Sequence, residues 1–169
     1  MIVAALVALV VVPATILLVP QPLPRSKTVT TTPTETILAA SDIPDVGWGL
    51  RASGTNRTGI WRLFSVHNER ILAFLNVTLW VEPDANGAQE TMSSIAGTVG
   101  YVTEDGLVTG ADASLFWSYG SGAYAGMVVR RFNVVFRLDA YLESSFALTK
   151  SDLGTWAGWQ LEKIEAVAT

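Results

Sequence analysis

The chain has 169 residues, a formal net charge of −4, no cysteine, and only 15% charged residues. Without cysteine it has no disulfide, no thiolate metal ligand and no cysteine nucleophile. Its negative net charge provides no basic field for nucleic acid. A charged fraction well below the usual quarter indicates that part of the surface is hidden against a partner or a membrane.

Residues 1–24 are predicted to be a transmembrane anchor. Ile2 to Val19 is almost continuously apolar, and no charged residue precedes Arg25. A helix of about 18 residues is roughly 27 Å long, close to the ~30 Å hydrocarbon core of a bilayer. The alternatives are a cleaved signal peptide and a buried core helix. A signal peptide would need a positive n-region and an A-x-A-like cleavage site. Neither is present, so we expect a retained signal-anchor.

Residues 25–35 are predicted to be a Thr/Pro-rich linker of the type found outside cells. Asn56 and Asn76 each begin an N-x-Thr sequon, so both are possible glycosylation sites of a glycoprotein exposed outside the cytoplasm. Arg25 and Lys27 favour the opposite orientation, because positive residues flanking a span tend to stay cytoplasmic. We expect a single-pass membrane protein whose globular domain lies outside the cytoplasm.

Residues 36–169 are predicted to form one extracytoplasmic domain, which begins with a helical turn over 36–48. The glycine-rich stretch 49–59 is either a loop or a ragged edge strand. Runs of β-forming residues then predict strands over 60–67 and 71–81, joined by a tight turn at 68–70.

The second half of the domain begins with a helix capped by Asp84, whose apolar stripe continues to Val99. Strands follow over 112–119, 123–132 and 134–142, with a hairpin turn at 120–122. A capping pattern from Thr149 to Asp152 begins a final helix that ends near Val167. Short turns between strands predict an α+β fold, an antiparallel sheet of about five strands with two helices on one face.

Three segments carry a family resemblance: residues 38–44, residues 132–137 and residues 156–164. Over roughly 36–168 the chain resembles small membrane-anchored extracytoplasmic domains of archaea and bacteria, with a PsbP-like fold. The resemblance implies a sheet flanked by helices and an address outside the cytoplasm. It implies no catalytic residue.

The strands over 71–81 and 134–142 alternate, so each has one apolar face and one mixed outer face. The outer face is either covered by residues 49–59 or the linker, or it is a partner surface. In the last helix one tryptophan lies off the apolar stripe, and it is either tucked under a loop or a contact residue. The predicted interaction residues are Phe74, Trp80, Tyr141 and Trp159.

Groups for catalysis or metal binding are scarce. His67 is the only histidine, and a single turn histidine is typically a surface residue rather than a ligand. No Ser/His/Asp arrangement or G-x-S-x-G elbow can be assembled. Asp112 and the pair at 104–105 lack the ladder of oxygens that calcium requires. We therefore predict no catalytic, cofactor-binding or metal-binding residue.

The arginines of the late strands are predicted to be structural. Arg130 and Arg131 are adjacent on a strand and face opposite ways, so they are not expected to serve one site. Arg137 is expected to pair with Asp139 or Glu143 as a surface ion pair.

The sequence thus predicts a non-catalytic accessory or interaction subunit of a membrane or cell-surface complex. Its expected partners are the membrane and other protein subunits, not nucleic acid. One alternative is a module that binds a small ligand or a peptide between sheet and helices. Another is a pilin-like filament subunit with residues 2–19 in the filament core, although no processing site precedes that segment.

Overall fold

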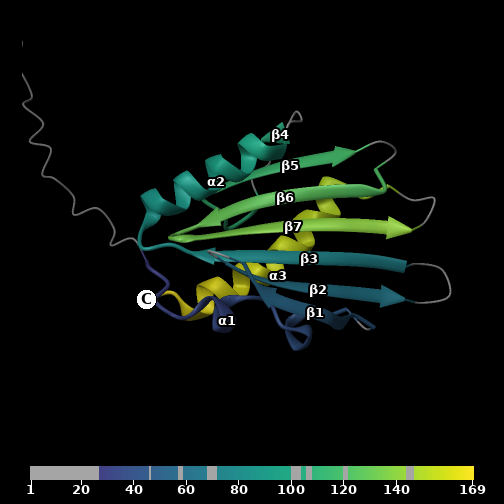
Figure 1. The fold of residues 1–169 in the computed structure, drawn as a ribbon, viewed down its shortest axis with the longest axis horizontal. Coiled ribbons are helices and arrows are strands. Elements are labelled where there is room, and N and C mark those ends of the chain that lie inside the picture. The colour runs from purple at the N-terminus through teal and green to yellow at the C-terminus, as the bar shows by residue number, and fades with distance from the viewer. Residues whose placement is uncertain are drawn as a thin grey trace, which may run out of the picture.

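The computed structural model describes residues 27–45, 47–56, 59–67, 72–99, 104–105, 108–119, 122–143 and 147–169. These residues form an α+β fold built on one antiparallel sheet (Figure 1). The predicted anchor at 1–24 lies outside the described residues. Among the helices that the structure does describe, none combines the length and the apolar character that a membrane crossing requires.

Seven strands form the described sheet, in the order β1-β2-β3-β7-β6-β5-β4. The predicted strands are confirmed with small shifts, but the expected number of about five is wrong. Residues 49–55 supply an edge strand, and a two-residue strand extends the opposite edge. The elements in chain order are α1 (Pro33–Thr36), the 3-10 turn η1 (Ala40–Asp42), β1 (Gly49–Thr55), β2 (Ile60–His67), β3 (Leu72–Val81), α2 (Ala85–Val99), β4 (Glu104–Asp105), β5 (Ala113–Tyr119), β6 (Tyr124–Arg131), β7 (Val134–Glu143) and α3 (Lys150–Val167).

The two long helices lie on opposite faces of the sheet, so the prediction that both share one face is wrong (Figure 1). Val135 packs in the α2 cluster, whereas its neighbour Phe136 packs in the α3 cluster. Successive strand residues point to opposite faces, which separates the two clusters. The apolar stripe of a helix predicts that the helix is packed, but it does not specify which face it covers.

Both predicted helix starts are confirmed. The Asp84 carboxylate accepts hydrogen bonds from the backbone N–H groups of Asn86 and Gly87, at 2.9 and 2.8 Å. At α3 the backbone N–H of Thr149 donates to Asp152 Oδ2 (2.8 Å), and the N–H of Asp152 donates to Thr149 Oγ1 (3.2 Å). This reciprocal arrangement satisfies two backbone donors that the helix itself leaves unpaired.

The described part of the predicted linker, 27–35, packs onto the domain. Val29 is only 2% exposed and forms a β-bridge with Ala168. Thr28 and Thr169 exchange two backbone hydrogen bonds, at 3.0 and 3.1 Å. We call residues 27–29 the strap. It holds the chain beside the C-terminus, at the end of the sheet where β3 ends and β7 begins.

Asn133 fastens the strap to the sheet. Its side chain is 3% exposed; Nδ2 donates to the carbonyls of Val29 (2.9 Å) and Glu82 (2.7 Å), and Oδ1 accepts from the Val29 N–H (2.7 Å). The preceding residue, Phe132, has φ +55°, which turns the chain tightly between β6 and β7. The sequence predicted that one strand ends at 132 and the next begins at 134, but it did not predict the clamp.

A second buried amide fastens the segment that follows the strap. Gln160 of α3 is fully buried; its Oε1 accepts from the N–H of Leu38 and its Nε2 donates to the carbonyl of Thr36, both at 2.8 Å. Burying an unpaired amide is costly, so its pairing with backbone on both sides fixes this segment against α3.

Candidate functional site

The candidate site lies on the sheet face that carries α2. This helix packs mainly on β6 and β7, its cluster also includes Trp80 of β3 and borders Tyr119 of β5, and the rest of that face on β2 and β3 lies outside the cluster. We call the uncovered part the open face. The strand register assigns it the following side chains: Trp61, Leu63, Phe74, Asn76, Tyr119, Tyr124, Arg137, Asp139 and Tyr141.

An aromatic row crosses four neighbouring strands of the open face. Phe74 of β3 stands opposite Tyr141 of β7, Tyr141 opposite Tyr124 of β6, and Tyr124 opposite Tyr119 of β5. The ring centroids of Phe74 and Tyr141 are 6.4 Å apart, and those of Tyr119 and Tyr124 are 5.1 Å apart. At about 4.8 Å per strand the row is roughly 14 Å long.

Tyr141 is the most exposed member of the row, at 43%. Among the described large hydrophobic residues, only Leu50 (48%) is also classed as exposed. The row lies at the end of the sheet toward which the β2, β5 and β7 arrows point in Figure 1, opposite the strap. An exposed tyrosine between partly buried aromatic rings is a common element of protein interfaces.

A polar network lies beside the row. Asp139 Oδ1 accepts hydrogen bonds from Tyr124 OH and Arg137 Nη2, each at 2.7 Å. The expected pairing of Arg137 with Asp139 is therefore confirmed. Burial, with the hydrogen bond to Asp139 as the second cause, raises the pKa of Tyr124 to about 12. Burial opposes ionisation of Arg137, but its hydrogen bond and attraction to Asp139 raise its pKa. At neutral pH Tyr124 is therefore neutral and Arg137 is charged.

Trp117 forms the boundary between the network and the part covered by α2. The Arg137 guanidinium lies 5.3 Å from the centre of the Trp117 ring, a cation–π distance. The indole lies against Gly126, where an added Cβ would be 2.3 Å from ring atoms. Trp117 Nε1 and Arg137 Nε are buried and have no hydrogen-bond partner among the described residues.

The four predicted interaction residues do not form one surface. Phe74 and Tyr141 are neighbours in the aromatic row. Trp80 packs half-buried against the α2 cluster, and Trp159 packs half-buried on the opposite face, against the α3 core. Of the two alternatives for the outer face, cover by residues 49–59 does not occur in the described part, because residues 49–55 pair with β2 as an edge strand. Part of the face, over β6 and β7, is covered by α2 instead. An interaction role for each residue stays a prediction.

Sequence reasoning missed Tyr119 and Tyr124. The predicted hairpin turn at 120–122 already implied that strand residues just outside the turn face one another. Extending the register across β6 and β7 to Phe74 and Tyr141 required the strand order, which no local pattern provides.

The two predicted glycosylation sites lie in different settings. Asn56 is exposed after β1, and its Oδ1 accepts from the Gly59 N–H at 2.8 Å. Asn76 is half-buried on the open face, opposite Asp139. Both assignments stay predictions, and a glycan on Asn76 would occupy the open face beside the aromatic row.

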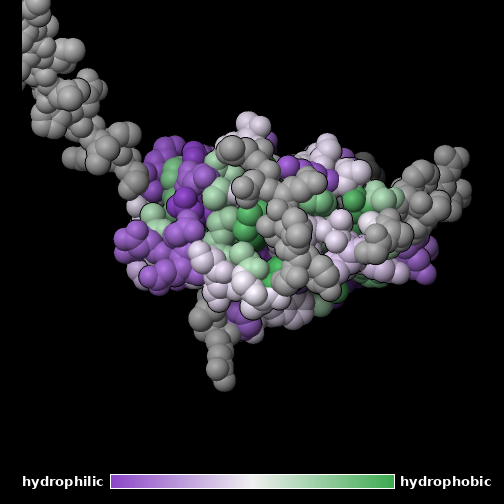
Figure 2. Space-filling model, turned by 90° about the horizontal axis from the view of Figure 1, so that it is seen from above, coloured by the Kyte–Doolittle hydropathy of each residue, from purple (hydrophilic) through white to green (hydrophobic). Residues whose placement is uncertain are grey.

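One expectation about the arginines is wrong. Arg130 and Arg131 both reach Asp112, with N–O distances of 3.9 and 2.9 Å. Arg131 also donates to Glu165 from Nε (2.7 Å), and the strap residue Lys27 pairs with Glu165 at 3.3 Å. Asp112 lies beside the end of β6, where its backbone N–H donates to the carbonyl of Arg130, so both long arginine side chains can reach it although they start on opposite faces. Hydrophilic residues gather at this end of the molecule in Figure 2.

Metal-binding groups do not converge in the described part of the chain. No group of three or more His, Asp or Glu side chains there could hold a metal ion, and His67 is exposed at the end of β2.

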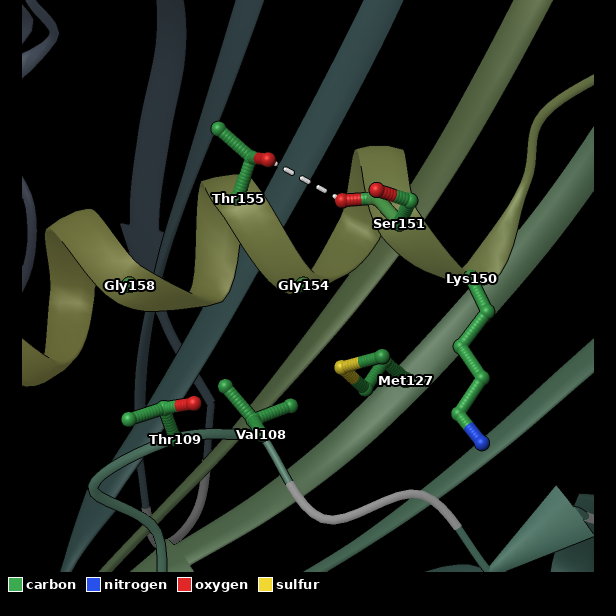
Figure 3. A pocket seen from close by; sticks show the side chains of 8 residues that line it. All are labelled: Val108, Thr109, Met127, Lys150, Ser151, Gly154, Thr155 and Gly158. Atoms are coloured by element: carbon green, nitrogen blue, oxygen red, sulfur yellow. Dashed lines mark hydrogen bonds between the residues drawn. The ribbon is translucent and has the colours of Figure 1, made fainter.

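A groove of about 530 Å³ lies between α3 and the loop before β5 (Figure 3). Gly154 and Gly158 make its helical wall, and Met127 makes its floor. The Thr155 hydroxyl already donates to the carbonyl of Ser151, at 3.0 Å. Lys150, Thr109 and Ser151 also line the groove, but no described acidic or aromatic side chain joins them there, so we assign the groove no function.

Comparison of the chain with protein-family models, curated proteins and solved structures found no match. The resemblance to PsbP-like domains therefore stays a prediction. Function has to be argued from the geometry of the open face.

Proposed function

We propose that the chain is a non-catalytic interaction subunit of a membrane complex. In this proposal residues 1–24 anchor it, the domain lies outside the cytoplasm, and the aromatic row binds another protein subunit. The observation that carries the proposal is the row itself, four aromatic side chains on neighbouring strands, which begins at Tyr119 beside the α2 cluster and continues over Tyr124, Tyr141 and Phe74 outside that cluster.

The chemistry of the row supports a protein partner. Tyrosine provides a large contact area at a low cost in side-chain entropy, and it retains a hydroxyl for hydrogen bonding. The network of Asp139, Arg137 and Tyr124 beside it is fixed before a partner arrives, so little ordering is required on binding. An apolar row beside a charged network matches the core and rim of a typical interface.

The strap supports a location above the membrane surface. Residues 20–26 separate the apolar run from the strap, and they reach at most about 25 Å. Along β3, Phe74 lies about 23 Å from Val81 at the strap end, at ~3.3 Å per residue. The row would then stand away from the lipid surface, which favours an extracytoplasmic protein domain as the partner.

A photo-crosslinking amino acid at position 141 tests the proposal in the native membrane. We expect Tyr141 replaced in this way to give one discrete adduct with another protein. The same amino acid at Leu50, the other exposed hydrophobic position, should give none. Equal labelling at both positions, or none at 141, would contradict the assignment.

Native sizing after mild-detergent extraction gives an independent test. We expect the unaltered chain in a large hetero-complex and the Phe74→Ser/Tyr141→Ser variant as a single chain in its micelle. Leu50→Ser should keep the complex. Sedimentable fibres in place of a discrete complex would instead indicate a filament subunit.

A further inference from the structure

A separate cavity lies on the α3 face of the sheet, at the end opposite the strap. Its volume is about 400 Å³, and it is bounded by the start of β1, the ends of β2 and β7, and the start of α3. Leu142 and Leu148 contribute apolar surface to it. The volume lies in the usual range for a pocket that binds a small molecule.

Two tryptophans form one wall of this cavity. Trp48 and Trp156 meet edge to face, with ring centroids 5.6 Å apart and planes at 75°. Both line the cavity and are half-buried. A cation is attracted to the electron-rich face of an indole ring and not to its edge, and tryptophan is the strongest aromatic partner for cations.

Two carboxylates lie at the same cavity, Asp45 and Asp152. Asp45 is exposed and has no ion pair or side-chain hydrogen bond with any other described residue. Asp152 uses Oδ2 to cap α3, which leaves its Oδ1 available. No lysine or arginine is among the described lining residues. Lys150, the nearest cation in sequence, lines the groove on the other flank of α3 (Figure 3).

The two indoles, the leucines and the two carboxylates of the cavity together favour one class of ligand. An anion would be repelled by both carboxylates, and a neutral apolar molecule would gain nothing from them. A small inorganic cation would lose its hydration against apolar walls. A cation whose charge is spread over methyl groups gains from indole, leucine and carboxylate together.

We propose that the cavity binds a trimethylammonium compound of the size of choline. The positive group lies against Trp48 and Trp156, and Asp45 balances its charge. Because Asp45 and Asp152 would repel a phosphate, the ligand is the free compound rather than a phosphocholine lipid headgroup. This proposal does not rest on the aromatic row or on the function proposed for it.

Calorimetric titration of the full chain in a maltoside detergent tests the proposal. We expect saturable binding of choline. Binding of 3,3-dimethyl-1-butanol, which has the same shape without the charge, should be at least tenfold weaker. Glycerophosphocholine represents the lipid headgroup and should also bind more weakly than choline. Equal binding of choline and its neutral analogue would overturn the proposal, and so would tighter binding of glycerophosphocholine.

Matched variants test the residues. Asp45→Asn should weaken choline binding about fivefold, whereas Glu90→Gln, an exposed carboxylate on α2, should leave it unchanged. Trp48→Leu should abolish binding. Because Trp48→Leu also changes packing, the decisive variant is Asp45→Asn, which alters an exposed side chain. If Asp45→Asn and Glu90→Gln bind choline alike, the site is not the one described.

Discussion

Replacing Asn133 by alanine removes the clamp that holds the strap. Three hydrogen bonds are lost, and they leave the N–H and C=O of Val29 and the C=O of Glu82 without this partner. Each buried hydrogen bond contributes about 1 kcal/mol net, so we expect the free energy of unfolding to fall by about 3 kcal/mol. For a domain of this size that lowers Tm by roughly 10 °C.

Urea unfolding of the full chain in detergent, followed by tryptophan fluorescence, measures this loss. Asn86→Ala is the matched control, because Asn86 is exposed on α2 and its side chain makes no hydrogen bond with another described residue. It should change stability by less than about 0.5 kcal/mol. Asn133→Asp keeps one of the three bonds, as acceptor from the Val29 N–H, and should also be strongly destabilised. If Asn133→Ala lowers the free energy of unfolding no more than Asn86→Ala does, the Asn133 amide does not hold the strap.

Three further predictions concern buried groups. Gln160→Leu leaves the Leu38 N–H and the Thr36 carbonyl unpaired and should cost about 2 kcal/mol in the same assay; a neutral effect would show that water replaces the amide. Gly126→Ala should cost more than about 2 kcal/mol because the methyl group would meet the indole of Trp117, and a smaller side chain at 117 should recover part of that loss. The raised pKa of Tyr124, about 12, means that the folded state favours its neutral form. That contribution is complete below pH 10 and is lost as pH rises toward 12. After solvent screening it amounts to about 1 kcal/mol, so unfolding followed against pH should show Tyr124→Phe with a smaller alkaline loss than the unaltered chain.

Local patterns predicted the elements well. The sequence could predict the cap at Asp84 and the capping box at Thr149 and Asp152. A helix start needs hydrogen-bond acceptors for its first N–H groups, and these lie within three residues along the chain. The faces of β3 and β7 were readable because alternation is a property of each strand alone. The sequence did not decide whether the residues of β1 form a loop or a strand. Glycine has a low strand propensity, and it is pairing with β2 that holds this segment in the sheet.

The candidate sites could be predicted only in part. Phe74 and Tyr141 could be named as outward aromatic residues, but that they face one another depends on β7 pairing with β3. The sequence predicted an interaction role for Trp80 and Trp159 as well. In the structure Trp80 packs against the α2 cluster and Trp159 against the α3 core, so neither belongs to the aromatic row. The cavity at Trp48 and Trp156 joins residues more than a hundred positions apart, which no spacing rule detects.

The sequence alone determined the α+β class, the positions of the strands and long helices, and the buried and outward faces of each strand. These depend on interactions within a few residues, namely caps, turns and periodicity. Tertiary structure decided the insertion of β7 between β3 and β6, the placement of α2 and α3 on opposite faces, and the clamp of Asn133 on the strap. These depend on which distant surfaces bury one another. Two apolar faces of one sheet offer a helix similar burial, so local sequence does not choose between them.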